Sequence, residues 1–132
     1  LRAMANAIDA LAVADYAQLA SNALLTNETT IAEKPELIEK MIKSFQKGLE
    51  YTIEKPEEAF EISKKFIEGL DDDDKDVQME ILLSSIRLWK ADRLGFSDPE
   101  SWQNMQDVLI QMGLIDDPLD LDRAYTNQFV GE

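Results

Sequence analysis

Apolar residues recur every three to four positions over much of the chain, which is the spacing of one face of a helix. Over residues 35–54 the repeat is carried by six of them: Ile38, Met41, Ile42, Phe45, Leu49 and Ile53. The same period continues over residues 56–67 and 75–90, and again from Pro99 to a stop at Gly113. Four amphipathic helices are therefore predicted, and the broad stripe of the third predicts burial on more than one side.

Proline and acidic residues mark where three of these helices begin. Pro35 and Pro56 each stand between a lysine and a glutamate, and Pro99 follows Asp98. Proline suits the first helical turn, because its fixed φ is already helical and its missing N–H would have no partner there. Ser97 or Asp98 is predicted to cap the helix that starts at Pro99. These features build a scaffold and contain no catalytic or metal motif.

The two ends of the chain have weaker periodicity. Residues 1–25 are rich in alanine and leucine, and they fit either a helix or a short buried strand that contains Ile8, Leu11 and Val13. Residues 23–31 contain three threonines and are predicted to be extended. The tail of the chain is predicted to be a loop that leads to a short helix or an extended arm.

The predicted fold class is mostly α, with a small extended or β element at the N-terminal end. The 132 residues, 45% of them hydrophobic, are enough for one ordinary globular core. We expect a single domain or a fragment of one, with an extended segment over residues 1–31 and a helical part over residues 32–132.

Composition disfavours several classes of function. The chain has no histidine and no cysteine, so it lacks the commonest general base, the commonest transition-metal ligand and any thiol chemistry. Its net charge of −14 disfavours binding to nucleic acid or to anionic lipid. We therefore expect a protein that is not an enzyme, with no catalytic residue, metal site or cofactor.

The acidic run and the two tryptophans are expected to have structural roles. The acidic run at residues 71–74 is predicted to be a linker that ends in a helix cap. Trp89 and Trp102 lie on apolar helix faces, where packing in the core is the expected role of a tryptophan.

The order of these elements resembles a known family. Residues 15–62 read DYAQLASNALLTNETTIAEKPELIEKMIKSFQKGLEYTIEKPEEAFEI, and residues 97–130 read SDPESWQNMQDVLIQMGLIDDPLDLDRAYTNQFV. A helix and a Gly-Phe turn lie between them. In this order they are similar to the part after the second hinge crossing in substrate-binding proteins of ABC importers, among the relatives of the thiamine-pyrimidine-precursor and sulfonate binders. The resemblance covers roughly residues 8–130.

This resemblance implies that the chain is the C-terminal portion of a two-lobed protein with a periplasmic-binding-protein type II α/β fold. Such proteins bind a small molecule, such as a thiamine-pyrimidine precursor, riboflavin, nitrate or a sulfonate, in the cleft between their lobes. They deliver it to an ABC permease, which implies a periplasmic or extracytoplasmic location, with a lipoprotein anchor as one form of the full-length protein. An enzyme of the superfamily, the yeast-type pyrimidine synthase, depends on histidine, iron and a cysteine-rich segment. This chain contains no histidine and no cysteine.

Four residues correspond, by the same resemblance, to the family's hinge-proximal segment that faces the cleft: Asp15, Tyr16, Ser21 and Asn22. In that role their polar groups would hydrogen-bond a heterocycle or an oxyanion, and Tyr16 would stack on a ring. Asp15 and Asn22 equally suit turning or capping of the backbone, and that interpretation stays open. The sequence departs from the family after Tyr16, where Ala17 stands in place of the usual glycine.

A self-contained helical interaction module is the alternative. Two predicted helices start with the sequence lysine-proline-glutamate, at Lys34 and Lys55, and this suggests a repeat. The next start that contains proline, at Asp98, does not follow at the same distance along the chain. A solenoid also needs about three repeats to cover its core. Apolar helix faces that a missing lobe leaves uncovered would offer a surface for a homodimer.

Overall fold

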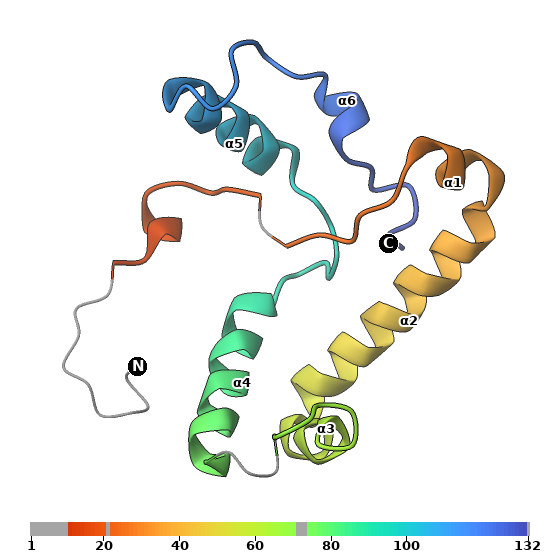
Figure 1. Cartoon of the computed structure of the whole chain (residues 1–132), viewed down its shortest axis with the longest axis vertical. Coiled ribbons are helices and arrows are strands. Elements are labelled where there is room, and N and C mark those ends of the chain that lie inside the picture. The colour runs from red at the N-terminus through yellow and green to blue at the C-terminus, as the bar shows by residue number, and fades with distance from the viewer. Residues whose placement is uncertain (1–10, 21, 71–73, 132) are drawn as a thin grey trace. The chain divides into compact units, whose positions relative to one another are not determined.

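The computed structural model describes residues 11–20, 22–70 and 74–131, and every regular element in these ranges is a helix (Figure 1). The elements are the 3₁₀-helix η2 (Val13–Asp15) and the α-helices α1 (Glu28–Glu33), α2 (Pro35–Glu54), α3 (Pro56–Ser63), α4 (Lys75–Trp89), α5 (Pro99–Gln111) and α6 (Leu121–Ala124). The mostly α prediction is confirmed over these ranges, which contain no strand. Within them, no helix combines the length and the apolar character that crossing a membrane requires.

The chain divides into two compact units. In the described ranges, the first unit is Lys43–Leu94 and the second is residues 11–42 together with residues 95–131. The helices α3 and α4 belong to the first unit, whereas α1, α5 and α6 belong to the second. The long helix α2 contributes to both. Each unit has its own set of stabilising contacts.

Three helices start at the predicted prolines. Pro35, Pro56 and Pro99 are the first residues of α2, α3 and α5. Asp98 is the residue that caps α5, because its carboxylate accepts a hydrogen bond from the backbone N–H of Glu100 at 3.2 Å. Such a cap satisfies one of the N–H groups that have no partner within the helix.

The end of the acidic run also forms a predicted cap. Asp74 accepts hydrogen bonds from the backbone N–H groups of Asp76 and Val77, at 3.0 and 3.2 Å, and thereby starts α4. The rest of the run, residues 71–73, lies outside the described residues. The helix cap predicted at the end of this run is therefore confirmed at Asp74.

The extended segment predicted for residues 23–31 is wrong over its second half, because α1 begins at Glu28. Asn27 supplies the reason, since its side-chain oxygen accepts a hydrogen bond from the backbone N–H of Thr30 at 2.8 Å. Glu28 adds negative charge in the first turn, where the helix dipole favours it. A capped start thus outweighs the β preference of the threonines, which depends strongly on context.

The buried strand considered for the N-terminal end is not observed in the described part of the chain. Val13 begins η2, and Leu11 and Val13 are 75% and 60% exposed. The backbone turns here, because the N–H of Asp15 donates to the carbonyl of Ala12 at 3.1 Å. Ile8, the third residue of that prediction, lies outside the described residues.

Two helices end earlier than predicted. The helix α3 ends at Ser63, and the chain continues in turns towards Gly69, whose φ of 81° is the conformation that glycine tolerates best. The helix α4 ends at Trp89, just before the end of its predicted range at residue 90. Lys90 marks the change, because its ψ of 123° is extended and no longer helical.

The helix α5 ends as predicted. Gly113 has a φ of 67°, and its N–H donates to the carbonyl of Ile110 at 2.9 Å. The N–H of Leu114 donates to the carbonyl of Leu109, also at 2.9 Å. This pair of hydrogen bonds is a Schellman motif, which satisfies carbonyl groups at the end of the helix.

A small core joins α3 and α4 in the first unit. Ala59 and Phe60 of α3 and Ile86 of α4 are buried, with exposed fractions of 8%, 4% and 5%. Trp89 does not join them, since it is 39% exposed, so the prediction of a core role for this tryptophan is wrong. It stands at the last position of α4, where neighbouring residues are also exposed.

Glu61 also links α3 to α4, through charge. Its carboxylate accepts hydrogen bonds from the ammonium groups of Lys64 and Lys75, each at 2.8 Å. These hydrogen bonds lower the pKa of Glu61 from 4.5 to about 2. The carboxylate is solvent-exposed, so the link is open to screening by salt.

Acidification is expected to weaken this link. A carboxyl group whose pKa is lower in the folded than in the unfolded chain stabilises the fold while it is ionised. That contribution is fully present above pH 4.5 and is lost as the pH falls towards about 2. In Glu61→Gln the free energy of unfolding should therefore change less with pH over this window, as measured by urea unfolding. Glu68→Gln is the control and should keep the wild-type profile; the same profile in Glu61→Gln would contradict this role.

The C-terminal tail is held against α5 in the second unit. The rings of Trp102 and Tyr125 stack, with centroids 5.0 Å apart and planes inclined by 6°. Gln106 is buried, and its side-chain oxygen accepts a hydrogen bond from the N–H of Leu119 at 2.6 Å. The side chain of Asn127 exchanges two hydrogen bonds of 2.8 Å with the backbone just before α5. The predicted short helix of the tail is α6.

The predicted apolar stripe of α2 is only partly covered, because four of its six residues are half-buried and the other two are exposed: Ile38, Ile42, Leu49 and Ile53 against Met41 and Phe45. Met41 and Phe45 are 58% and 53% exposed, although their spacing predicts a buried face, and Leu37, which was not part of that prediction, is 58% exposed. We call these three residues the α2 stripe. Exposed apolar surface of this kind normally lies against another protein segment.

Candidate functional site

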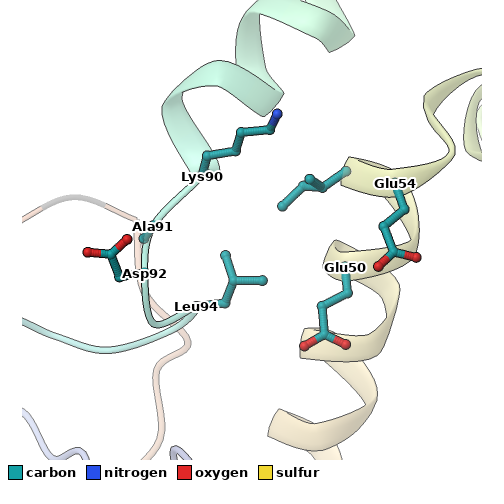
Figure 2. Close-up of a pocket in the computed structure, with 7 residues that line it drawn as sticks. Glu50, Glu54, Lys90, Ala91, Asp92 and Leu94 are labelled. Carbon is teal, nitrogen blue, oxygen red and sulfur yellow. The ribbon is translucent and has the colours of Figure 1, made fainter.

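One hollow lies within the first unit. It has a volume of about 450 Å³, and Figure 2 shows the residues that line it. They come from the end of α2 and from the segment after α4: Glu50, Ile53, Glu54, Lys90, Ala91, Asp92 and Leu94. A hydrogen bond of 2.9 Å from the side-chain amide of Gln46 to the carbonyl of Leu94 fixes that segment to α2.

The charges of this first hollow do not form a metal site. Figure 2 shows the Asp92 carboxylate on the opposite side of its segment from α2, so it does not converge with Glu50 and Glu54. Lys90 adds a positive charge to the same lining. Across the described residues, no group of three or more acidic, histidine or cysteine side chains is arranged to hold a metal ion. The hollow is therefore a mixed-charge surface without an evident chemical role.

A second hollow lies within the second unit and contains a residue predicted as a ligand contact. It measures about 420 Å³ and is formed by the segment after η2 and by one face of α5. The lining residues are Tyr16, Ala17, Gln18, Glu100, Asn104, Asp107, Val108 and Gln111. We call it the Tyr16 hollow.

Two long-range hydrogen bonds hold the two walls of the Tyr16 hollow together. The side-chain amide of Asn104 donates to the carbonyl of Gln18 at 3.1 Å. The N–H of Ala20 donates to the carbonyl of Ser101 at 3.3 Å. Both bonds join the segment after η2 to the first turns of α5, which places the ring of Tyr16 beside that helix.

The Tyr16 hollow is negative and rich in amides. Glu100 and Asp107 contribute carboxylates, and none of its lining residues is a lysine or an arginine. Asp107 also accepts a hydrogen bond from the side-chain amide of Gln103 at 2.9 Å. Tyr16 is 75% exposed, so a face of its ring is open to a ligand. The arrangement suits binding, and it contains no nucleophile paired with a base.

The structure separates the four residues that the sequence predicted as ligand contacts. Tyr16 lines the Tyr16 hollow, whereas Asp15 and Asn22 are exposed and line neither hollow. The backbone of Asp15 closes η2, in agreement with the turn role left open for it. Ser21 lies outside the described residues.

The polar face of α5 was missed by the sequence analysis. Asn104, Asp107 and Gln111 lie three to four positions apart and so share one face, which reads as an ordinary solvated surface. Only the contact with Gln18 distinguishes this face, and the two partners lie far apart in the sequence. No periodicity within α5 could have indicated that contact.

Comparison with known proteins gives two matches. A family model described as "NMT1/THI5 like" matches residues 1–59, a range that includes Tyr16. The riboflavin-binding protein RibY of Chloroflexus aurantiacus is 32% identical over an alignment of 135 positions, which covers 98% of this chain. The chain spans 38% of the length of RibY. No solved structure matches the chain.

Proposed function

Because the chain belongs to the NMT1/THI5-like family, we propose that it is part of the solute-binding component of an ABC importer. In this proposal the complete protein has a periplasmic-binding-protein type II α/β fold and binds a small molecule between two lobes. The molecule is of the kind bound by its relatives, such as riboflavin, a thiamine-pyrimidine precursor, nitrate or a sulfonate. Asp15, Tyr16, Ser21 and Asn22 are proposed ligand contacts near the hinge.

The similarity to RibY is the observation that carries this proposal. An identity of 32% that extends over 98% of the chain involves both compact units. RibY is a riboflavin-binding protein, so riboflavin is the first ligand to test. Binding without catalysis also suits a chain that has no histidine and no cysteine.

The same proposal names the partners and the location. The complete protein would act outside the cytoplasm, free or lipid-anchored, and deliver its ligand to an ABC permease. The α2 stripe supports a larger assembly, because three exposed apolar residues on one helix face call for a covering surface. The remainder of a two-lobed protein is the proposed cover, and a homodimer through the same stripe is the alternative.

Riboflavin is expected to stabilise the full-length gene product. At about 100 times its Kd, a ligand that binds only the folded state raises the free energy of unfolding by about 2.7 kcal/mol. The measurement is thermal unfolding with and without riboflavin, followed by circular dichroism. The 132-residue chain alone should show no shift, because in this proposal it carries only part of the cleft.

Each outcome of this experiment has a meaning. If riboflavin does not shift the unfolding temperature of the full-length gene product, then an aminopyrimidine, nitrate and an aliphatic sulfonate are tested in the same way. Absence of a shift with every ligand would overturn the proposed function. A full shift in the 132-residue chain alone would instead favour a self-contained binding module.

A further inference from the structure

We infer that the Tyr16 hollow is a subsite for a planar heteroaromatic ring that carries N–H donors, and that it rejects anions. This inference rests on the proposed function and adds the α5 residues Asn104, Asp107 and Gln111 to the ligand contacts. It also selects among the ligand classes of the proposal. Donor-bearing rings such as aminopyrimidines and flavins are favoured, and nitrate and sulfonates are disfavoured.

Size and shape suit a ring. The volume of about 420 Å³ falls within the range of small-molecule pockets. The ring of Tyr16 is 75% exposed at the rim, and the half-buried side chain of Val108 supplies an apolar surface in the lining. A planar aromatic ligand can therefore stack on Tyr16 while its edge faces the polar groups of α5.

The edge that the protein offers is rich in hydrogen-bond acceptors, whereas one N–H of the Gln18 amide and one of the Asn104 amide are already used, which leaves each of these side chains one further N–H. The amide nitrogen of Gln18 donates to the carbonyl of Ala14 at 2.9 Å, and that of Asn104 donates to the carbonyl of Gln18 at 3.1 Å. Both side chains keep an oxygen as an acceptor. Asp107 keeps a second carboxylate oxygen beyond the one that Gln103 occupies. A ligand with N–H groups complements this edge.

The charges of the lining residues also favour donor-bearing rings over anions. Glu100 and Asp107 lie in the lining without a cationic residue, so an anion would meet two carboxylates with no compensating partner. Like charges within a few ångströms repel each other, and the net charge of −14 adds to that repulsion. A neutral ring with N–H donors avoids this repulsion, and a protonated ring is attracted by the same two carboxylates.

The test uses the full-length gene product and measures Kd for riboflavin, an aminopyrimidine and an aliphatic sulfonate by calorimetry. Tyr16→Leu should raise the Kd of the ring ligand that binds by about tenfold, the loss expected for one aromatic stack. Asp107→Lys should raise it by a similar factor and should improve sulfonate binding. If Asp107→Lys does not fold, Asp107→Asn tests the same group with a smaller change.

Two matched controls separate these effects from general ones. Phe66→Leu removes an aromatic ring that is 81% exposed and outside both hollows. Asp117→Lys changes the net charge as Asp107→Lys does, at an exposed position of the same unit outside the hollow. Both controls should keep the wild-type Kd for each ligand.

The outcomes distinguish this inference from the proposed function. If the protein binds a ring ligand and the Tyr16 and Asp107 variants bind it with the wild-type Kd, the subsite is wrong and the solute-binding function stands. If wild-type protein binds the sulfonate more tightly than either ring, the selection for donor-bearing rings is wrong. If it binds none of the probes, the proposed function fails and the subsite fails with it.

Discussion

Phe60→Ala is expected to destabilise the first unit by about 3–5 kcal/mol, the cost of removing a buried phenylalanine ring. Phe60 is only 4% exposed and lies in the contact between α3 and α4. Ala59 and Ile86 are the other buried apolar residues in the described ranges, so few side chains can move to fill the cavity. Because a domain is stable by only about 5–15 kcal/mol, this loss is large for the unit.

Urea unfolding followed by circular dichroism measures this effect. Phe66→Ala is the matched control, since it removes the same ring from a position that is 81% exposed. The control should change the free energy of unfolding by no more than about 0.5 kcal/mol. Equal effects of the two substitutions would show that the contact between α3 and α4 is not the core of this unit.

Gln106→Met is expected to destabilise the second unit by about 0.5–1.5 kcal/mol, because it removes the side-chain oxygen to which the backbone N–H of Leu119 donates. Gln106 is 7% exposed, and its side-chain oxygen lies 2.6 Å from the nitrogen of Leu119. Methionine has nearly the same length and volume, so packing changes little. The loss should therefore come from the missing hydrogen bond.

Hydrogen exchange is the most direct measurement of this second effect. The amide of Leu119 should exchange faster in Gln106→Met, while amides of α3 and α4 in the first unit keep their wild-type rates. Gln103→Met is the control, because Gln103 stands one turn earlier on the same helix and is exposed. An unchanged exchange rate at Leu119 would mean that this hydrogen bond does not hold the tail.

Local signals predicted most of the helices. Pro35, Pro56 and Pro99 each start a helix, and Asp98 caps one, because these residues act on the backbone beside them. The same kind of signal was overlooked at Asn27, whose cap starts α1 within a stretch that reads as extended. The family resemblance predicted from the order of these elements is also confirmed.

Burial was harder to predict than helix position. Met41 lies on the apolar stripe of α2 but is 58% exposed, whereas Gln106 is polar and buried. A periodic pattern indicates which face of a helix is apolar, but the segment that covers this face comes from distant parts of the chain. Gln106 is buried because the tail returns to α5, and its own polar character gives no sign of that contact.

The same limit applies to the Tyr16 hollow. Tyr16 was predicted as a ligand contact from the family resemblance, and the structure places it beside Asn104 and Asp107. That neighbourhood depends on a hydrogen bond between Asn104 and Gln18, which are remote in sequence. Local propensity and helical period contain no information about such a pair.

The positions of the two tryptophans provide an optical probe for each unit. Trp89 ends α4 in the first unit, and Trp102 is stacked on Tyr125 in the second, and the chain has no other tryptophan. Replacing either one with phenylalanine would leave an emission signal from a single unit. Whether the two units melt together or in sequence could then be seen by fluorescence alone, without a label.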